Sequence, residues 1–219
     1  TLEFANINAS SVTILAPKTF TLPAYPAVGA NVTATGLTLS LSAAPLSAFV
    51  NVSLSGPGLN FTPSTFTFLA GGSTSAGFTL SASQIGVQLI NYTVGGPGHK
   101  EFLPLEAGNI TVQAARTFVM PAYPIMANGR ESQPLTVTAS TAPDAEVTIT
   151  PTGTSLTFNP SSLTITGPAT TGSWTVQGSS DGTHTVTYAI NGTSRFLYIQ
   201  PLDSSITIIP VKTCTPPVL

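Results

Sequence analysis

Charged residues are scarce in this chain. Six of its 219 residues are Lys or Arg and eight are Asp or Glu, so charged residues make up 6% of the sequence and the formal net charge is −2. Nucleic-acid binding requires a stripe of basic side chains, which six scattered cations do not form. We therefore expect no nucleic-acid partner, and we expect uncharged polar groups to hydrate the surface.

Long apolar runs are also missing. No stretch approaches the roughly 20 apolar residues that span a bilayer, although the mean hydropathy is +0.33. The chain does not begin with a basic segment followed by a short apolar core, which is the pattern of a signal peptide. We expect no direct membrane insertion by this segment.

Cysteine occurs once, as Cys214. An unpaired thiol is unusual in an extracellular chain, so we expect a disulfide from Cys214 to a residue beyond this sequence or to another chain. The alternative is a free, partly buried cysteine.

Residue patterns that carry catalysis or bind metal are lacking. His99 and His184 are 85 positions apart, with His99 in a predicted "GGPGHKE" hairpin and His184 at the start of a predicted outer strand, and Asp144, Asp181 and Asp203 stand singly. Zinc needs three or four clustered ligands and calcium sites need Asp-rich runs. Spacing alone leaves open a glycosidase-type carboxylate pair, but the acidic residues fall at expected loops and strand ends. We expect no enzyme activity, no metal and no cofactor.

Alternation of apolar and β-branched residues with polar ones is present throughout. It recurs at 36–42, 49–54, 66–70, 90–94 and 109–113, and again at 134–139, 146–151, 162–167, 184–190 and 205–209. Gly or Pro interrupts it every 8 to 12 residues. This pattern predicts an all-β fold of antiparallel sandwiches, with at most one helical turn near 81–89.

The chain repeats itself. "TFTLPAYPAV" (19–28) returns as "TFVMPAYPIM" (117–126), and aligning the halves from there pairs residues along the whole unit with an offset that drifts from 98 to 94. The pairs are Leu37 with Leu135, Pro45 with Pro143, Phe61 with Phe158, Phe78 with Trp174, Tyr92 with Tyr188, Phe102 with Phe196 and Ile110 with Ile206. Such matching indicates tandem duplication.

A segment that occurs three times sets the expected domain limits. "VTILAPKT" (12–19), "ITVQAART" (110–117) and "ITIIPVKT" (206–213) each place a basic residue and Thr after a closing strand. We expect 1–16 to be the closing strand of a preceding repeat or an extension, 17–115 and 116–213 to be the two domains, and 214–219 to lead to a following region. Only about five residues separate the strands of adjacent copies, without a flexible Gly/Ser run, so we expect a stiff end-to-end rod.

Each "PAYP" element is expected at an edge strand or a strand switch, because proline cannot donate to a β-ladder. Tyr25 and Tyr123 are expected either to cover the domain junction or to be ordinary core residues.

These features resemble a known fold. An aromatic residue on the fifth strand (Phe78, Trp174) and a tyrosine in the penultimate strand (Tyr92, Tyr188) are similar to the wider immunoglobulin-like superfamily, although the Cys and Trp core pattern of antibody domains is missing. The "F-[TN]-P-S-[ST]-[FL]-T-[FI]" segments (61–68, 158–165) are similar to repeats of giant surface glycoproteins and adhesins. The low charge and the Ser/Thr/Pro/Gly-rich composition most resemble the large flagellar membrane glycoprotein of green algae. That resemblance implies a flagellar coat that contacts surfaces during gliding.

N-glycosylation sequons support an extracellular location. Seven of ten Asn lie in N-x-[ST] with x not Pro, namely Asn8, Asn31, Asn51, Asn60, Asn91, Asn109 and Asn191. Asn51 lies between Val50 and Val52, so strand alternation points it outward if the valines point inward; Asn60 and Asn109 have similar neighbours. We expect N-linked glycans on these residues. The alternative is that the sequons only reflect a Thr-rich composition.

Two functions follow from these patterns. The first is a structural or adhesive ectodomain repeat that forms a rod or protective coat at the cell surface, with neighbouring repeats, other surface glycoproteins or the substratum as partners. The second is a specific ligand- or carbohydrate-binding module that uses the domain-end loops 95–101 and 191–195. Those loops differ in sequence between the copies. This difference favours the first function, a spacer that makes weak multivalent contacts, over a specific binding module.

Overall fold

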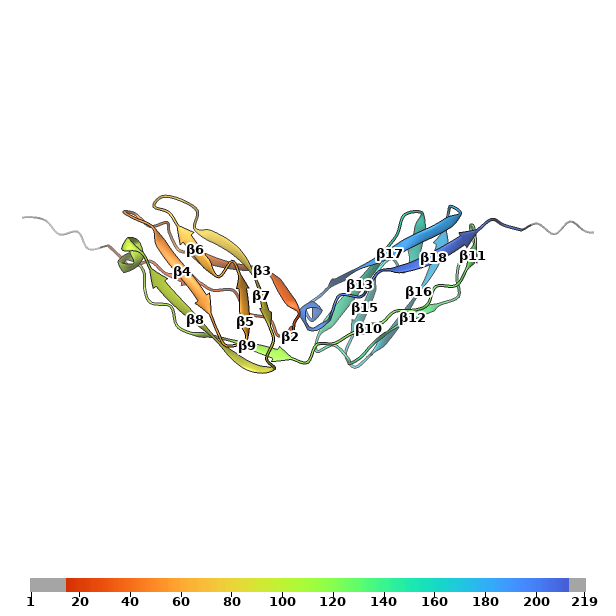
Figure 1. Cartoon of the computed structure of the whole chain (residues 1–219), viewed down its shortest axis with the longest axis horizontal. Helices are drawn as coiled ribbons and strands as arrows, with labels where there is room; N and C mark the ends of the chain where they lie inside the picture. The colour runs from red at the N-terminus through yellow and green to blue at the C-terminus, as the bar shows by residue number, and fades with distance from the viewer. Residues whose placement is uncertain (1–14, 213–219) are drawn as a thin grey trace, which may run out of the picture.

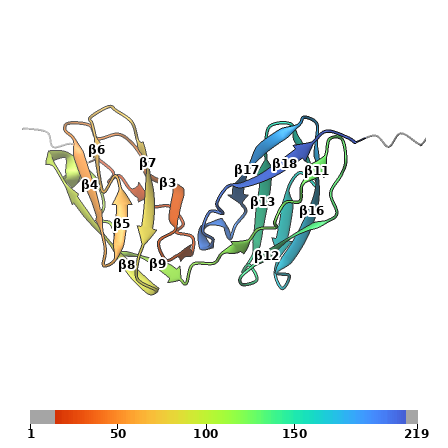
Figure 2. The ribbon, with the colours of Figure 1, turned by 45° about the vertical axis from the view of Figure 1, so that its right-hand side comes forward.

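The protein consists of two β-sandwiches joined end to end and inclined to each other (Figures 1 and 2). The structure is a computed structural model, which describes residues 15–212. The two sandwiches meet at the middle of the molecule, and the outer end of each points away from the other (Figure 1). The predicted all-β fold of two tandem sandwiches is confirmed.

The first sandwich contains two sheets with the strand orders β1-β3-β7-β5 and β2-β9-β8-β4-β6. A short 3-10 helix, η1 (Pro97–Glu101), follows β8. The strands are β1 (Phe20–Thr21), β2 (Val28–Gly29), β3 (Thr33–Leu41), β4 (Val50–Ser55), β5 (Leu59–Thr62), β6 (Thr65–Phe68), β7 (Ser75–Ala82), β8 (Gly86–Gly95) and β9 (Gly108–Gln113).

The second sandwich repeats this arrangement with the orders β10-β12-β16-β14 and β11-β18-β17-β13-β15. Its 3-10 helix is η2 (Arg195–Leu197), which follows β17. The strands are β10 (Phe118–Val119), β11 (Met126–Ala127), β12 (Leu135–Ala139), β13 (Glu146–Thr152), β14 (Leu156–Asn159), β15 (Leu163–Thr166), β16 (Thr171–Gly178), β17 (Gly182–Asn191) and β18 (Ser204–Ile209).

The strand order is immunoglobulin-like. In each unit one sheet has the order of strands A, B, E and D, and the other contains G, F and C. The first part of the chain pairs with both sheets, antiparallel in β1 with β3 and parallel in β2 with β9. One connection differs from the usual order: after β4 the chain forms the edge strand β5 of the opposite sheet before it returns to form β6 beside β4.

The "PAYP" elements lie where the chain changes sheets, as predicted. Residues 23–26 connect β1 in one sheet with β2 in the other, and residues 121–124 connect β10 with β11 in the same way. A crossing segment makes no ladder hydrogen bonds, so the missing N–H of each proline costs nothing there.

Apolar side chains of alternating strand residues fill each sandwich. β4 shows this directly, because Val50, Val52 and Leu54 are buried while the residues between them are not. Phe78 in the first core and Trp174 in the second occupy matching positions at the centre, and Trp174 is 1% exposed. The aromatic residue on the E strand therefore stands at the centre of a core without a disulfide.

Tyr25 and Tyr123 belong to these cores. The hydroxyl of Tyr25 lies 2.8 Å from that of Tyr92, and the Tyr188 hydroxyl donates to that of Tyr123 at 3.2 Å. Burial raises the pKa of Tyr25 and of Tyr123 above the ordinary value. The expectation that they cover the domain junction is wrong, and the alternative of core residues holds.

Two local predictions are wrong. The "GGPGHKE" segment contains η1 and not a hairpin, because Pro97 fixes the φ of a helical first turn. Residues 81–89 form no helical turn, within the prediction of at most one, because β7 extends to Ala82 and β8 begins at Gly86. His184 lies within β17, which has a neighbour on each side, and its Nε2 is 2.9 Å from the carbonyl oxygen of Ser180.

We expect Phe78→Ala to destabilise the first sandwich by about 3–5 kcal/mol, because it removes a ring packed against Phe61 and Phe66 and leaves a cavity. Hydrogen exchange should show lost protection in β3 and β7. Fluorescence of Trp174, the one tryptophan in the chain, should report an unchanged second sandwich. Val87→Ala, at a site 69% exposed, is the matched control, and an equal loss of protection in both sandwiches would contradict independent cores.

Candidate functional site: the joint between the sandwiches

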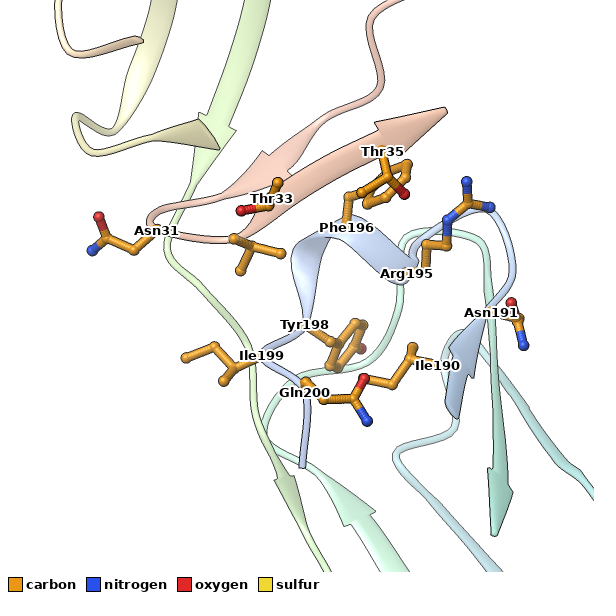
Figure 3. Close-up of a pocket in the computed structure, with 11 residues that line it drawn as sticks. Asn31, Thr33, Thr35, Ile190, Asn191, Arg195, Phe196, Tyr198, Ile199 and Gln200 are labelled. Carbon is orange, nitrogen blue, oxygen red and sulfur yellow. The ribbon is translucent and has the colours of Figure 1, made fainter. Parts of the chain in front are cut away.

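A cleft of about 690 Å³ lies where the two sandwiches meet (Figure 3). The first sandwich contributes the turn between β2 and β3 and the start of β3, and the second contributes the end of β17, η2 and the segment after it. The lining residues are Asn31, Val32, Thr33, Thr35, Ile190, Asn191, Arg195, Phe196, Tyr198, Ile199 and Gln200.

The linker beside this cleft is held by backbone hydrogen bonds. β9 ends at Gln113 and β10 begins at Phe118, which leaves residues 114–117 between them. The Arg116 N–H donates to the Leu197 carbonyl, and the Ile199 N–H donates to the Arg116 carbonyl, both at 2.8 Å. The linker is therefore paired with the η2 segment and is not a free tether.

The Arg116 side chain joins the two sandwiches. It is 8% exposed, and its guanidinium donates to the Ala142 carbonyl at 2.8 Å, to Asp144 Oδ1 at 2.7 Å and to Gln113 Oε1 at 2.9 Å. The Gln113 amide in turn donates to Asp144 Oδ2 at 3.3 Å. Because Gln113 closes β9 of the first sandwich and Asp144 belongs to the second, this cluster is a polar link between them. The hydrogen bond from Arg116 lowers the pKa of Asp144 below its ordinary value.

Apolar contacts cross the joint in both directions. Phe196 of the second sandwich packs against the core of the first, and Ala27 of the first packs against the core of the second. The Arg195 guanidinium lies 4.2 Å from the centroid of the Phe196 ring. η2 thus carries an apolar contact of the second sandwich with the first, beside the polar contact of the Asp144 loop.

Gly29 permits this close approach. A Cβ on Gly29 would lie 2.8 Å from the Leu197 carbonyl oxygen and 3.0 Å from the Ala115 Cα. These neighbours are backbone atoms that no side-chain rotation can move. The matching position in the second sandwich is Ala127 at the end of β11, where a Cβ is accommodated.

A similar set of hydrogen bonds holds the start of the first sandwich. The Lys18 N–H donates to the Glu101 carbonyl and the Leu103 N–H donates to the Lys18 carbonyl, both at 2.8 Å. The Lys18 ammonium donates to the Ala44 carbonyl and to Glu101 Oε2, the latter at 2.6 Å. Its carboxylate partner lies in η1, whereas that of Arg116 lies in a loop.

The Glu101 carboxylate has several donors. Besides Lys18, the Leu46 N–H donates to it at 2.9 Å and the Ser47 hydroxyl donates at 3.1 Å. The ion pair with Lys18 is the largest cause that lowers the pKa of Glu101 from 4.5 to about 2.

These hydrogen bonds correct the alignment of the repeats. Lys18 pairs with Phe102 as Arg116 pairs with Tyr198, so Tyr198 and not Phe196 matches Phe102. Phe196 matches Lys100 instead. The sequence alignment of Phe102 with Phe196 was wrong. It followed the identity of the two residues, whereas the structural match of Phe102 lies two residues later, at Tyr198.

The sequon asparagines lie on the surface. Asn31, Asn60, Asn91, Asn109 and Asn191 are exposed, and Asn51 is half-buried. The Asn51 Oδ1 accepts a hydrogen bond from the Thr67 hydroxyl at 2.8 Å. The predicted outward orientation is confirmed for Asn60 and Asn109. Asn8, like Cys214, lies outside the described residues.

The two loops proposed for ligand binding do not share a surface. Asn191 and Arg195 line the cleft at the joint, whereas η1 in 95–101 lies at the outer end of the first sandwich (Figure 1). The sequence singled out neither Gln113 nor Phe196 as functional. A basic residue three positions after each closing strand was the available signal for the joint.

Within residues 15–212, no three His, Cys, Asp or Glu side chains gather as metal ligands would. Nor does any helix in this part of the chain have the length and apolar character needed to cross a membrane. His99 contacts its own turn, with Nδ1 2.7 Å from the Gly96 carbonyl oxygen.

Comparisons with known proteins give only distant likenesses. No protein-family model matches the chain, and no curated protein matches it. Among solved structures, domains 4 and 5 of the S-layer protein SbsC are 13% identical over 73% of this chain and 76% of theirs, with a TM-score of 0.30. CBD12 from CALX1.2 is 8% identical over 88% and 100%, with a TM-score of 0.33, and the D0-D1 domain of intimin is 15% identical over 86% and 94%, with a TM-score of 0.28. The fold assignment therefore rests on the strand order described above.

We expect the Lys18–Glu101 pair to make the stability of the folded protein depend on pH. Because the pKa of folded Glu101 is about 2 and its ordinary value is 4.5, the pair stabilises the fold above pH 4.5 and this stabilisation is lost as the pH falls towards 2. Thermal unfolding followed across this range should show a smaller loss for Glu101→Gln than for the natural chain. Identical pH profiles for the two proteins would contradict the ion pair.

Proposed function

We propose that the chain is a stiffly jointed spacer in the ectodomain of a cell-surface protein. The observation that carries this proposal is the polar link across the joint, in which buried Arg116 donates to half-buried Gln113 and to exposed Asp144. A chain that only tethers two domains needs no buried cation between them, because an exposed flexible linker serves that purpose. A hydrogen-bonded linker and a closely packed joint hold two units at a set separation and angle.

The surface of the sandwiches supports an extracellular setting. Five sequon asparagines within the described residues are exposed, and few charges interrupt the surface. Glycans at these positions would hydrate a chain that has few ionic groups. The rod then belongs to an adhesive or protective coat, and the resemblance in composition to the green-algal flagellar glycoprotein gives surface contact during gliding as its role.

A second function is supported by the cleft itself. Its volume lies within the range of about 300–1,000 Å³ that small-molecule sites occupy. Hydroxyl and amide groups of Thr33, Thr35 and Gln200 line it beside Phe196, and such a mixture suits a carbohydrate. Saccharide binding at micromolar affinity that is lost in Gln200→Ala would favour this second function over the spacer.

We expect Gly29→Val to loosen the joint, because its side chain would overlap the backbone at Leu197 and Ala115. Labels on Ser64→Cys and Ser161→Cys, in a Cys214→Ser background, report the distance between the sandwiches by pulsed electron spin resonance. The natural joint should give a narrow distance distribution and Gly29→Val a broader or displaced one. The control Ala127→Val places the same side chain at the matching position away from the joint. A distribution for the natural joint as broad as that of a flexible linker would refute the spacer.

The glycan part of the proposal has its own test. Protein isolated from the native host should lose mass on treatment with a glycosidase that removes N-linked glycans, and peptide mapping should place the sugars on exposed sequons such as Asn60 and Asn109. Recombinant protein from a host without N-glycosylation is the control. An unchanged intact mass of the native protein would refute glycosylation while leaving the joint unaffected.

A further inference from the structure

The outer end of the first sandwich carries exposed apolar side chains. Leu15 is 61% exposed, Leu46 is 63% exposed and Leu103 is 47% exposed. Leu15 and Leu46 line a pocket of about 250 Å³ together with Lys100 and Glu101. We call Leu46, Lys100 and Leu103 the leading end.

The leading end matches the surface with which the second sandwich meets the first. The backbone pairs of Lys18 with Glu101 and of Arg116 with Leu197 fix the correspondence, which is 98 positions from Leu15 to Leu46 and 96 positions from η1 onward. The resulting matches are Leu46 with Asp144, Lys100 with Phe196 and Leu103 with Ile199, and all three matched residues lie on the second sandwich's side of the joint. Leu15 matches Gln113, which ends the first sandwich, so Leu15 stands where the end of a preceding sandwich would lie. The leading end therefore has the position of a joint surface, and no other sandwich among residues 15–212 covers it.

The outer end of the second sandwich matches the other side of the joint. Asn128 N–H donates to the Ile209 carbonyl as Ala30 N–H donates to the Gln113 carbonyl, both at 2.8 Å. Ile209 thus matches Gln113, and Glu131 matches Thr33 through the same turn. We call Ile209, Glu131 and Ala127 the trailing end. Lys212 follows Ile209 by three positions, as Arg116 follows Gln113.

We propose that the leading end binds the trailing end of another copy of this repeat, head to tail, in the geometry of the observed joint. This inference rests on the spacer function proposed above. It makes the described joint one instance of a contact that both outer ends are able to repeat.

The residue changes at the two ends are complementary. At the observed joint the polar pair is Gln113 with Asp144; at a repeated joint Ile209 would face Leu46, so that both partners become apolar together. Phe196 and Thr33 line the same cleft. Their counterparts are Lys100 and Glu131, which have opposite charges.

The exchange of partners has a physical consequence. If Ile209 met Asp144, the Asp144 carboxylate would lose the amide donor that Gln113 supplies. If Lys100 met Thr33, the Lys100 ammonium would have no counter-charge. Each end thus fits its own counterpart better than it fits a surface of the observed joint. The contact is heterologous, so repetition extends the rod instead of closing a ring.

A direct fusion of two copies tests the docking. Joining Val211 of the first copy to Lys18 of the second keeps three positions between Ile209 and the basic residue, and it places Ile209 where Leu15 lies now. Glu131→Cys in the first copy and Lys100→Cys in the second, with Cys214→Ser, should form a disulfide to the same extent as the reference pair Thr33→Cys and Phe196→Cys at the observed joint. The same two cysteines placed within one copy, at opposite ends, should not react with each other.

Charge exchange provides the second measurement. With labels on the sandwiches that flank the new joint, either Glu131→Lys in the first copy or Lys100→Glu in the second should broaden the distance distribution, and the two together should restore it. Singles without effect, or a double variant as broad as the singles, would overturn the docking. A flexible new joint beside a narrow observed joint would overturn the docking alone, whereas broad distributions at both joints would also overturn the spacer function.

Discussion

The placement of one buried guanidinium constrains the rest of this molecule. Burying the charge of Arg116 is costly unless its donors are paired, and its acceptors come from the preceding strand, a loop and a carboxylate of the following sandwich. All three must be in place together, so the linker, the closing strand of one unit and the loop of the next take a fixed arrangement. The close contact at Gly29 and the insertion of Phe196 both depend on this arrangement.

The two copies pair the basic residue at the start of the sandwich in different ways within the same fold. In each copy a basic residue donates to a matching carbonyl, that of Ala44 or of Ala142. The acid, however, lies in η1 as Glu101 in the first copy and in a loop as Asp144 in the second. Since the position of the acid can move while the geometry stays, the requirement concerns a satisfied cation at the start of each sandwich and not a particular sequence.

The fold was largely predictable from the sequence and the joint was not. Period-two alternation, a duplicated decapeptide and prolines at the strand switch are local signals, and each corresponds to what the structure shows. The joint depends on residues that are far apart in sequence, such as Gln113 and Asp144, whose meeting is fixed only once both sheets and η2 are placed. Matching Phe196 with Phe102 concealed this, because identical residues two positions out of register made an interface residue look like a core residue.

Most of the charged residues that the structure describes lie at the ends of the sandwiches. Both ion pairs of the described residues lie at the start of a sandwich, and Lys100, Arg130, Glu131 and Lys212 are exposed near the outer ends. Some sequons, in contrast, lie within the strands of the sheets, as Asn51 in β4 and Asn60 in β5 show. Electrostatic complementarity determines which surfaces meet and in which register more than it determines affinity. In the proposed rod, charges at the ends would therefore specify neighbours, and the sides, where Glu106 and Asp203 are the charged residues among those the structure describes, would carry sugars and make many weak contacts with another surface.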